Sequence, residues 1–347
     1  MVFSRMGIWL GFSILMLLCA TGCERGTSAP AAANALSSSA QPPQNSSVPQ
    51  MQASEPKGPV LRINPERAME YVKDLVTIGP RWPGSKGQEK TAAYLRAKLK
   101  NESLTEDAFE GDTPAGKLAM RNFIAKFPGA KDGIIVLAAH IDTPYPLRNT
   151  SFAGANDGAS STGLLLAIAD QLRGKKLEGY SVWLAFLDGE EAVQHWTATD
   201  SDYGSRHLAA KWHQDGTTGK IKAFILADMI GDADLNVLRD GNSTPWLEDM
   251  IFEAAKRLGY QSHFFAGEAG MDDDHTPFAR LGVPVADVID FNYGYNNSYW
   301  HTTQDTIDKL SPRSLQITGD VILETLRLLN ANADKLPAAT QAPRVPS

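Results

Sequence analysis

The segment FLDGEEAVQHW, residues 186–196, places two adjacent glutamates, Glu190 and Glu191, directly after an apolar run typical of a buried strand. Two like charges side by side disfavour ionisation of both carboxyl groups unless a cation neutralises them. The residues that complete such a site must therefore come from other parts of the chain.

Acids and a histidine also follow the other predicted strands. GIIVLAAHID ends in His140 and Asp142, and KAFILADMIG contains Asp228. In open α/β sheets, ligands bind beyond the carboxyl ends of the strands, so we expect one shared, acid-lined cleft. Nitrogen and oxygen ligands from His, Asp and Glu suit Zn²⁺. A single strand-terminal Asp is more often a helix cap, but acids at successive strand ends favour a metal site.

The elements that must position these side chains alternate along the chain. We predict helices at residues 65–79, 87–100, 161–173, 205–214, 243–259 and 311–332. We predict strands at residues 122–127, 133–142, 180–189, 222–231 and 283–291. This alternation predicts a single α/β domain with a central mixed, mostly parallel twisted sheet flanked by helices on both faces.

The N-terminus has the pattern of an export signal. Arg5 precedes the short apolar run GIWLGFSILMLLCA, which is shorter than a bilayer span. The ending ATGC resembles a bacterial lipobox, in which Cys23 is lipidated; cleavage of an ordinary secretory signal is the alternative. We therefore expect an exported protein, anchored by lipid to the bacterial cell envelope, with no other contact to the membrane.

Composition gives the remaining domain boundaries. We assign residues 1–22 to the signal peptide, 23–58 to a disordered tether rich in Ala, Pro, Ser and Gln, 59–337 to the catalytic domain and 338–347 to a flexible tail. The net charge of −7 gives no reason to propose a nucleic acid partner. We expect a monomer.

Several motifs together resemble a known family. AAHIDT, GANDGASSTGLLLAIA, FLDGEEA, DYGSRHLA, LADMIG, DDDHTPF and YWHTTQDT follow one another between residues 65 and 335. In this order they resemble the zinc-dependent M28 peptidase superfamily, and within it the glutaminyl-peptide cyclases. The resemblance implies a zinc aminopeptidase-like fold and an acyltransferase that converts N-terminal glutamine to pyroglutamate with release of ammonia.

The same resemblance implies roles for individual residues. The zinc ligands would be Asp157, Glu191 and His301, which leaves the fourth zinc position for substrate. Glu190 would be the general acid and base. Asp228 and Asp273 would form a proton-relay network. Trp196 and Trp300 would line the substrate pocket.

The metal motif leaves a second function open. Two-zinc aminopeptidases of the superfamily would use His140 and Asp228 for a second ion, with Asp157 bridging, and all three residues are present. A cyclase implies one zinc and an aminopeptidase two; in both, the substrates are peptide or protein N-termini. Trp196, Trp300 and Asp273, each at its family position, favour the cyclase. A non-catalytic binding domain is a third hypothesis, which the intact ligand set and Glu190 disfavour.

Overall fold

The computed structural model describes residues 54–337. The predicted signal peptide with Cys23, the tether up to residue 53 and the tail at 338–347 lie outside the described residues. Residues 54–58, the end of the predicted tether, lie against the C-terminal half of the domain. The Ser54 amide donates to Asn332 Oδ1, and Glu55 pairs with Arg257. Among the described residues, no helix has the length and apolar character needed to cross a bilayer.

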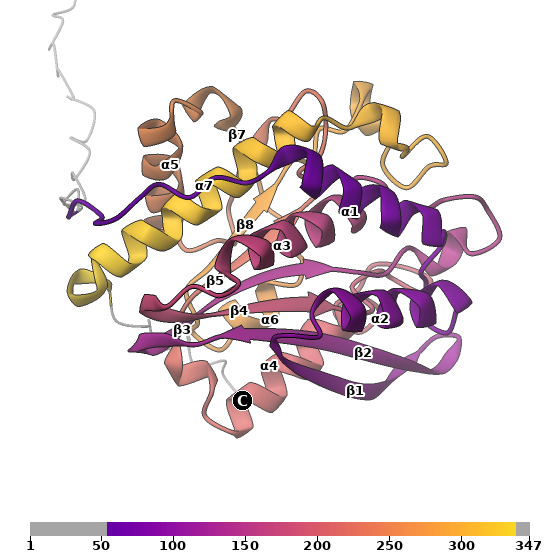
Figure 1. The fold of residues 1–347 in the computed structure, drawn as a ribbon. Helices are drawn as coiled ribbons and strands as arrows, with labels where there is room; N and C mark the ends of the chain where they lie inside the picture. Colours follow the sequence, from indigo (N-terminus) through magenta and orange to yellow (C-terminus); the bar gives the residue numbers. More distant parts are fainter. Residues whose placement is uncertain (1–53, 338–347) are drawn as a thin grey trace, which may run out of the picture. The chain divides into compact units, whose positions relative to one another are not determined.

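The centre of the domain is a six-stranded sheet in the order β1-β2-β4-β3-β5-β8 (Figure 1). Its strands are β1 (Ser103–Thr113), β2 (Gly116–Phe127), β3 (Gly129–His140), β4 (Leu177–Leu187), β5 (Ile221–Asp228) and β8 (Val285–Ile289). β4, β3, β5 and β8 are mutually parallel, whereas β2 is antiparallel to both of its neighbours. The mixed, mostly parallel sheet predicted from the sequence is therefore confirmed.

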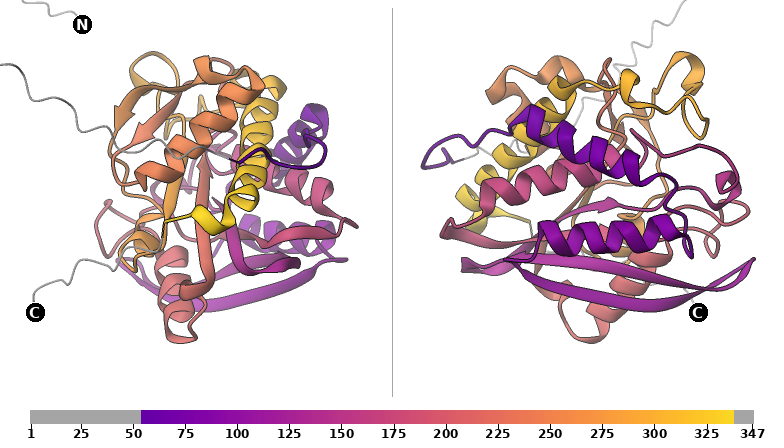
Figure 2. Two further views of the ribbon diagram at one scale, coloured as in Figure 1. Left: turned by 90° about the vertical axis from the view of Figure 1, so that its left-hand side faces the viewer. Right: turned by 45° about the vertical axis from the view of Figure 1, so that its right-hand side comes forward.

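Helices cover both faces of this sheet (Figure 2). One face carries α1 (Pro65–Ile78), α2 (Lys86–Lys98), α3 (Ala159–Leu172), α5 (Pro245–Leu258) and α7 (Pro312–Ala331). The other carries α4 (Tyr203–Gln214) and the short α6 (Thr276–Ala279). Side chains fix several helix starts, because Asn64, Ser85 and Ser311 each accept a hydrogen bond from a backbone N–H in the first turn of α1, α2 and α7.

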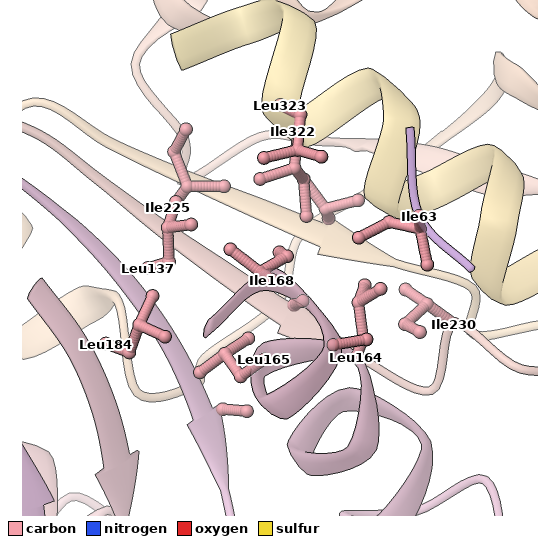
Figure 3. Close-up of a cluster of buried hydrophobic side chains, with 14 of the residues drawn as sticks. Ile63, Leu137, Leu164, Leu165, Ile168, Leu184, Ile225, Ile230, Ile322 and Leu323 are labelled. Carbon is pink, nitrogen blue, oxygen red and sulfur yellow. The ribbon is translucent and has the colours of Figure 1, made fainter. Parts of the chain in front are cut away.

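The hydrophobic core has two parts, one on each face of the sheet. Along β3, Leu137 and Ala139 pack with the α3 and α7 side, whereas Val136 and Ala138 pack with the α4 side. Figure 3 shows the first part, where side chains of β3, β4 and β5 lie opposite α3 and α7. Because the second half of β3 is buried on both faces, residues 134–139 form a continuous apolar run. This rigid centre fixes the strand ends that carry the acids.

The structure contains elements that the sequence does not predict. β1 is an edge strand with mostly exposed polar residues, joined to β2 by a tight hairpin that pairs Thr113 with Gly116. β6 (Val237–Asp240) and β7 (Phe264–Ala269) form a separate two-stranded parallel sheet. These short or polar segments lack the apolar pattern from which the other strands are predicted, as does the four-residue α6.

Replacing Leu165 tests the first part of the core. This α3 side chain is completely buried in the cluster of Figure 3. We expect Leu165→Ala to lower the free energy of unfolding by about 2–5 kcal/mol, because the cavity adds to the lost burial. Urea unfolding measures the change, with Val60→Ala as the control, since Val60 is 44% exposed. Equal effects of the two substitutions would contradict this packing.

Candidate active site

The predicted site residues come together at the carboxyl ends of the parallel strands. His140 and Asp228 are the last residues of β3 and β5. Glu190 and Glu191 follow β4, and Asp157 lies in the turn before α3. His301 lies in the long segment after β8 and has a left-handed backbone, with φ of 51°. The topology therefore brings together residues that end or follow the four parallel strands β3, β4, β5 and β8.

Asp157, Glu191 and His301 form one group that could hold a metal ion. His301 Nε2 lies 3.3 Å from Asp157 Oδ2 and 3.2 Å from Glu191 Oε1. Both carboxylate oxygens are buried and have no hydrogen-bond partner. Two carboxylates and an imidazole whose ligand atoms converge in this way match the donor set of a catalytic zinc site.

His140, Asp157 and Asp228 form a second group. His140 Nε2 lies 3.2 Å from one oxygen of each aspartate. Asp157 thus presents Oδ1 to this group and Oδ2 to the first. In contrast to the first group, the Asp228 oxygen already accepts a hydrogen bond from the Met229 amide.

The electrostatics of the first group also fit a bound cation. Burial raises the pKa of Glu191 to about 7, with the neighbouring charge of Asp157 contributing. A cation at this position would favour the ionised carboxylate and offset the cost of burying it. Glu190 belongs to neither candidate zinc group, and its Oε2 lies 3.5 Å from His140 Nδ1. The ligand and acid–base roles implied for these residues remain predictions.

Asp142 and Arg81 hold the loops that carry these groups. The carboxylate of Asp142 accepts the backbone N–H groups of both Glu190 and Glu191, at 3.1 and 3.2 Å. Arg81 is 1% exposed, and its guanidinium donates to backbone carbonyls of three segments, including Ile141 and Gly154. Burial lowers the pKa of Arg81 to about 10, so it stays charged beside the acids at neutral pH.

Asp305 orients the loop that carries Asp157. Its two oxygens accept the backbone N–H groups of Asn156 and Asp157, at 2.8 and 3.2 Å, and Tyr293 donates its hydroxyl at 2.7 Å. Asp305 is four residues after His301, so it links the two loops that supply two of the three candidate ligands. Such outer partners fix the direction of a ligand's lone pairs.

A cavity of about 480 Å³ opens beside these groups. Both predicted pocket tryptophans line it, Trp196 at the rim with 40% exposure and Trp300 partly buried. Trp300 also stacks on His301, with ring centroids 4.0 Å apart. Apolar residues complete the wall: Pro144, Pro146, Leu147, Met271, Ile289 and Phe291.

Asp273 and Glu190 both line the cavity. Together with Asp202 they form a third cluster of side chains, made of three carboxylates. Burial raises the pKa of Asp273 to about 6, and the charge of Asp228 contributes. Among the described residues no hydrogen bond joins Asp228 and Asp273, and the proton-relay role implied for this pair stays a prediction. Three residues were not singled out from the sequence: Asp202, Arg81 and Asp305. Asp202 does lie in the motif DYGSRHLA, and Asp305 lies in the motif YWHTTQDT.

Comparison with known proteins gives the family. The model of peptidase family M28 matches residues 122–326. The bovine glutaminyl-peptide cyclotransferase-like protein is 33% identical over 283 residues, which cover 73% of each chain. The chain therefore belongs to family M28 and, within it, to the glutaminyl-peptide cyclotransferases.

Solved structures of similar chains agree with this assignment. A glutaminyl cyclase from an Acidobacteriales bacterium is 50% identical, covers 80% of this chain and 99% of its own, and superimposes with a TM-score of 0.77. A Zn-dependent exopeptidase from Parabacteroides distasonis is 27% identical, covers 77% and 99%, and gives a TM-score of 0.70. This chain thus has a fold similar to those of a glutaminyl cyclase and of a Zn-dependent exopeptidase.

Loss of Asp305 tests how this M28 chain orients its ligands. We expect Asp305→Ala to weaken zinc binding by about 10- to 100-fold, because the turn that carries Asp157 loses both of its hydrogen-bond acceptors. Competition with a chelator measures the affinity. Tyr293→Phe, which removes only the hydroxyl that donates to Asp305, is the milder matched control. Unchanged affinity in Asp305→Ala would show that Asp157 is oriented without this support.

Proposed function

We propose that this chain is a zinc-dependent glutaminyl-peptide cyclotransferase that converts the N-terminal glutamine of peptides and proteins to pyroglutamate and releases ammonia. The observation that carries the proposal is the tryptophan-lined cavity in which Glu190 stands beside the Asp157, Glu191 and His301 group without belonging to it. The membership of the chain in the cyclotransferases supports the same reaction.

The charges of the cavity suit a substrate with a free α-amine. Its lining includes acids and no lysine or arginine among the described residues; the acids are Asp157, Glu190, Glu191, Asp228, Asp272 and Asp273. A cationic N-terminus is attracted to such a site, whereas an acidic group is repelled. Because the amine and the γ-amide belong to one residue, holding that residue folded supplies much of the rate, and no water has to be activated.

Glu190 is the proposed general acid and base. It takes a proton from the α-amine as the nitrogen attacks the γ-carbonyl carbon, and it then delivers the proton to the departing ammonia. Asp157, Glu191 and His301 would hold a zinc ion that supplies Lewis-acid polarisation of the amide carbonyl. Trp196 and Trp300 cover the glutamine side chain and limit the entry of water.

We propose one zinc ion, in the first group. The carboxylate oxygens that face His301 lack any hydrogen-bond partner, whereas the Asp228 oxygen that faces His140 has one in the Met229 amide. A two-zinc aminopeptidase remains the second candidate, because His140, Asp157 and Asp228 also converge and a zinc exopeptidase has a similar fold. In that reaction Glu190 would act as the base for an attacking water.

We also propose that the protein is a monomer, exported and held at the cell envelope by a lipid on Cys23. The signal-like N-terminal sequence and its ATGC ending support the export and the lipid anchor.

The two candidate functions differ in metal content and product. We expect one bound zinc per chain, ammonia release from a peptide with N-terminal Gln, and no leucine release from the matching peptide with N-terminal Leu. Metal analysis and the two assays on one preparation measure this. Two zinc ions with leucine release and no cyclisation of Gln would overturn the proposal in favour of the aminopeptidase.

The adjacent glutamates test the division of roles. We expect Glu190→Gln to lower kcat by about 10²- to 10⁴-fold while zinc remains bound, because only the proton-transfer group is lost. Glu191→Gln is the matched variant, and we expect it to weaken zinc binding, because an amide oxygen replaces an anionic ligand. Zinc content and kcat are measured for both. Equal loss of zinc in the two variants would contradict the assignment.

A further inference from the structure

Trp196 and Trp300 both line the cavity, but they are held in different ways. The Trp300 ring packs against two others, with centroid distances of 5.0 Å to Phe291 and 4.0 Å to His301. Among residues 54–337, no aromatic ring pairs with Trp196, and its indole N–H has no hydrogen-bond partner. The position of Trp196 therefore depends largely on the backbone that carries it.

Asp200 binds that backbone through three consecutive amides. Its Oδ1 accepts the Val193 N–H, and its Oδ2 accepts the N–H groups of Gln194 and His195, each at 2.9 Å. The last of these amides belongs to the residue directly before Trp196. The carboxylate of Asp200 thus fixes the chain on the N-terminal side of the tryptophan.

The chain on the C-terminal side of Trp196 is tied to the same residue. The Asp200 amide donates to the Thr197 carbonyl at 3.1 Å and to the Thr197 hydroxyl at 3.0 Å. The Ser201 hydroxyl also donates to the Thr197 carbonyl, at 3.0 Å. The residues before and after Trp196 are therefore both bound to Asp200, one through its carboxylate and the other through its amide.

Asp200 itself lies outside the cavity. It is 5% exposed and does not belong to the lining, and its Oδ1 also accepts the Tyr203 hydroxyl at 2.8 Å. Burial raises the pKa of Asp200, but its hydrogen bonds, with that from His195 first, bring the pKa below its ordinary value. The carboxylate is therefore ionised at neutral pH, and hydrogen bonds to a charged acceptor are stronger than neutral ones.

We propose that Asp200 is a positioning residue for Trp196, which it holds at the rim of the cavity by binding the backbone on both sides of the tryptophan. There the indole covers the glutamine side chain of the substrate. This inference rests on the proposed function, in which the cavity binds an N-terminal glutamine. Asp200 belongs to neither candidate zinc group and transfers no proton. Its loss therefore weakens substrate binding and leaves the metal and the chemical step in place.

Asp200→Asn tests this role, because the amide keeps the size of the side chain but loses its charge and one acceptor. We expect KM for the Gln peptide to rise by about 10-fold, with kcat within about threefold and zinc content unchanged, since Trp196 binds the substrate and the transition state equally. Trp196→Ala should raise KM by a similar factor. A wild-type KM in Asp200→Asn, or loss of its zinc, would overturn the proposal.

The double variant shows whether Asp200 acts through Trp196. If it does, adding Asp200→Asn to Trp196→Ala changes KM by less than about twofold, because the side chain that Asp200 positions is already absent. Independent effects would multiply to about 100-fold, and that result would contradict the proposal.

Asp320→Asn is the matched control for the same substitution elsewhere. Asp320 is a fully buried carboxylate in α7 that also accepts a backbone amide, that of Ile63, and it pairs with Arg62. We expect its substitution to lower stability and to leave KM unchanged. A rise in KM equal to that of Asp200→Asn would show that loss of any buried carboxylate has this effect, and would overturn the proposal.

Hydrogen exchange in the wild type tests the contacts without any variant or activity. Residues 194–199 are all exposed, so their amides are protected mainly by hydrogen bonds. We expect the amides of Gln194 and His195 to exchange at least about 10-fold more slowly than the amide of Trp196, which has no hydrogen-bond partner within the described part of the chain. Equal exchange of the three would rule out the proposed role, even if Asp200→Asn fails to fold.

Failure of the proposed function gives a different result. A wild type that hydrolyses the Leu peptide and leaves Gln peptides unchanged would overturn the proposed function alone. The KM values of the same variants would then be compared on that hydrolysis, because Trp196 lines the cavity in which either reaction takes place.

Discussion

The site depends on one carboxylate that accepts two consecutive backbone N–H groups. Asp142 binds the amides of both Glu190 and Glu191, and so it fixes the chain direction at the end of β4. With the backbone held, the two glutamate side chains diverge. Glu191 joins the group of Asp157 and His301, while Glu190 lies beside His140 and Asp273. Two identical side chains therefore reach different environments because a third acid determines where their backbone lies.

Burying several carboxylates in one site is energetically unfavourable, and several groups in the protein offset this cost. Arg81 supplies a buried positive charge beside Asp142, although its hydrogen bonds go to backbone carbonyls. Burial raises the pKa of Asp305 to about 6, and the N–H and O–H donors around its carboxylate oppose that shift. Asp157 Oδ2 and Glu191 Oε1 have no such donors, which is the state expected of ligands that a cation completes.

The sequence predicts those parts of the fold whose burial leaves a clear pattern. The buried parts of β3 and β5, residues 134–139 and 223–227, are continuous apolar runs because helices cover both faces. The two strands are parallel neighbours, so His140 and Asp228 at their carboxyl ends were expected in one cleft. β1 escaped prediction because an edge strand needs little apolar surface. Arg81 acts through contacts with segments distant in sequence, and no local pattern signals it.

The acidic edge strand bears on how the protein behaves next to copies of itself. β1 pairs with β2 on one side only within the described sheet, and its exposed residues include Glu106, Glu110 and Asp112. An open strand edge is a template for sheet extension between molecules, and charges placed along it oppose that pairing. Two copies of β1 brought edge to edge would set like charges against each other. The polar sequence that makes β1 hard to recognise therefore also opposes aggregation through this edge of the sheet.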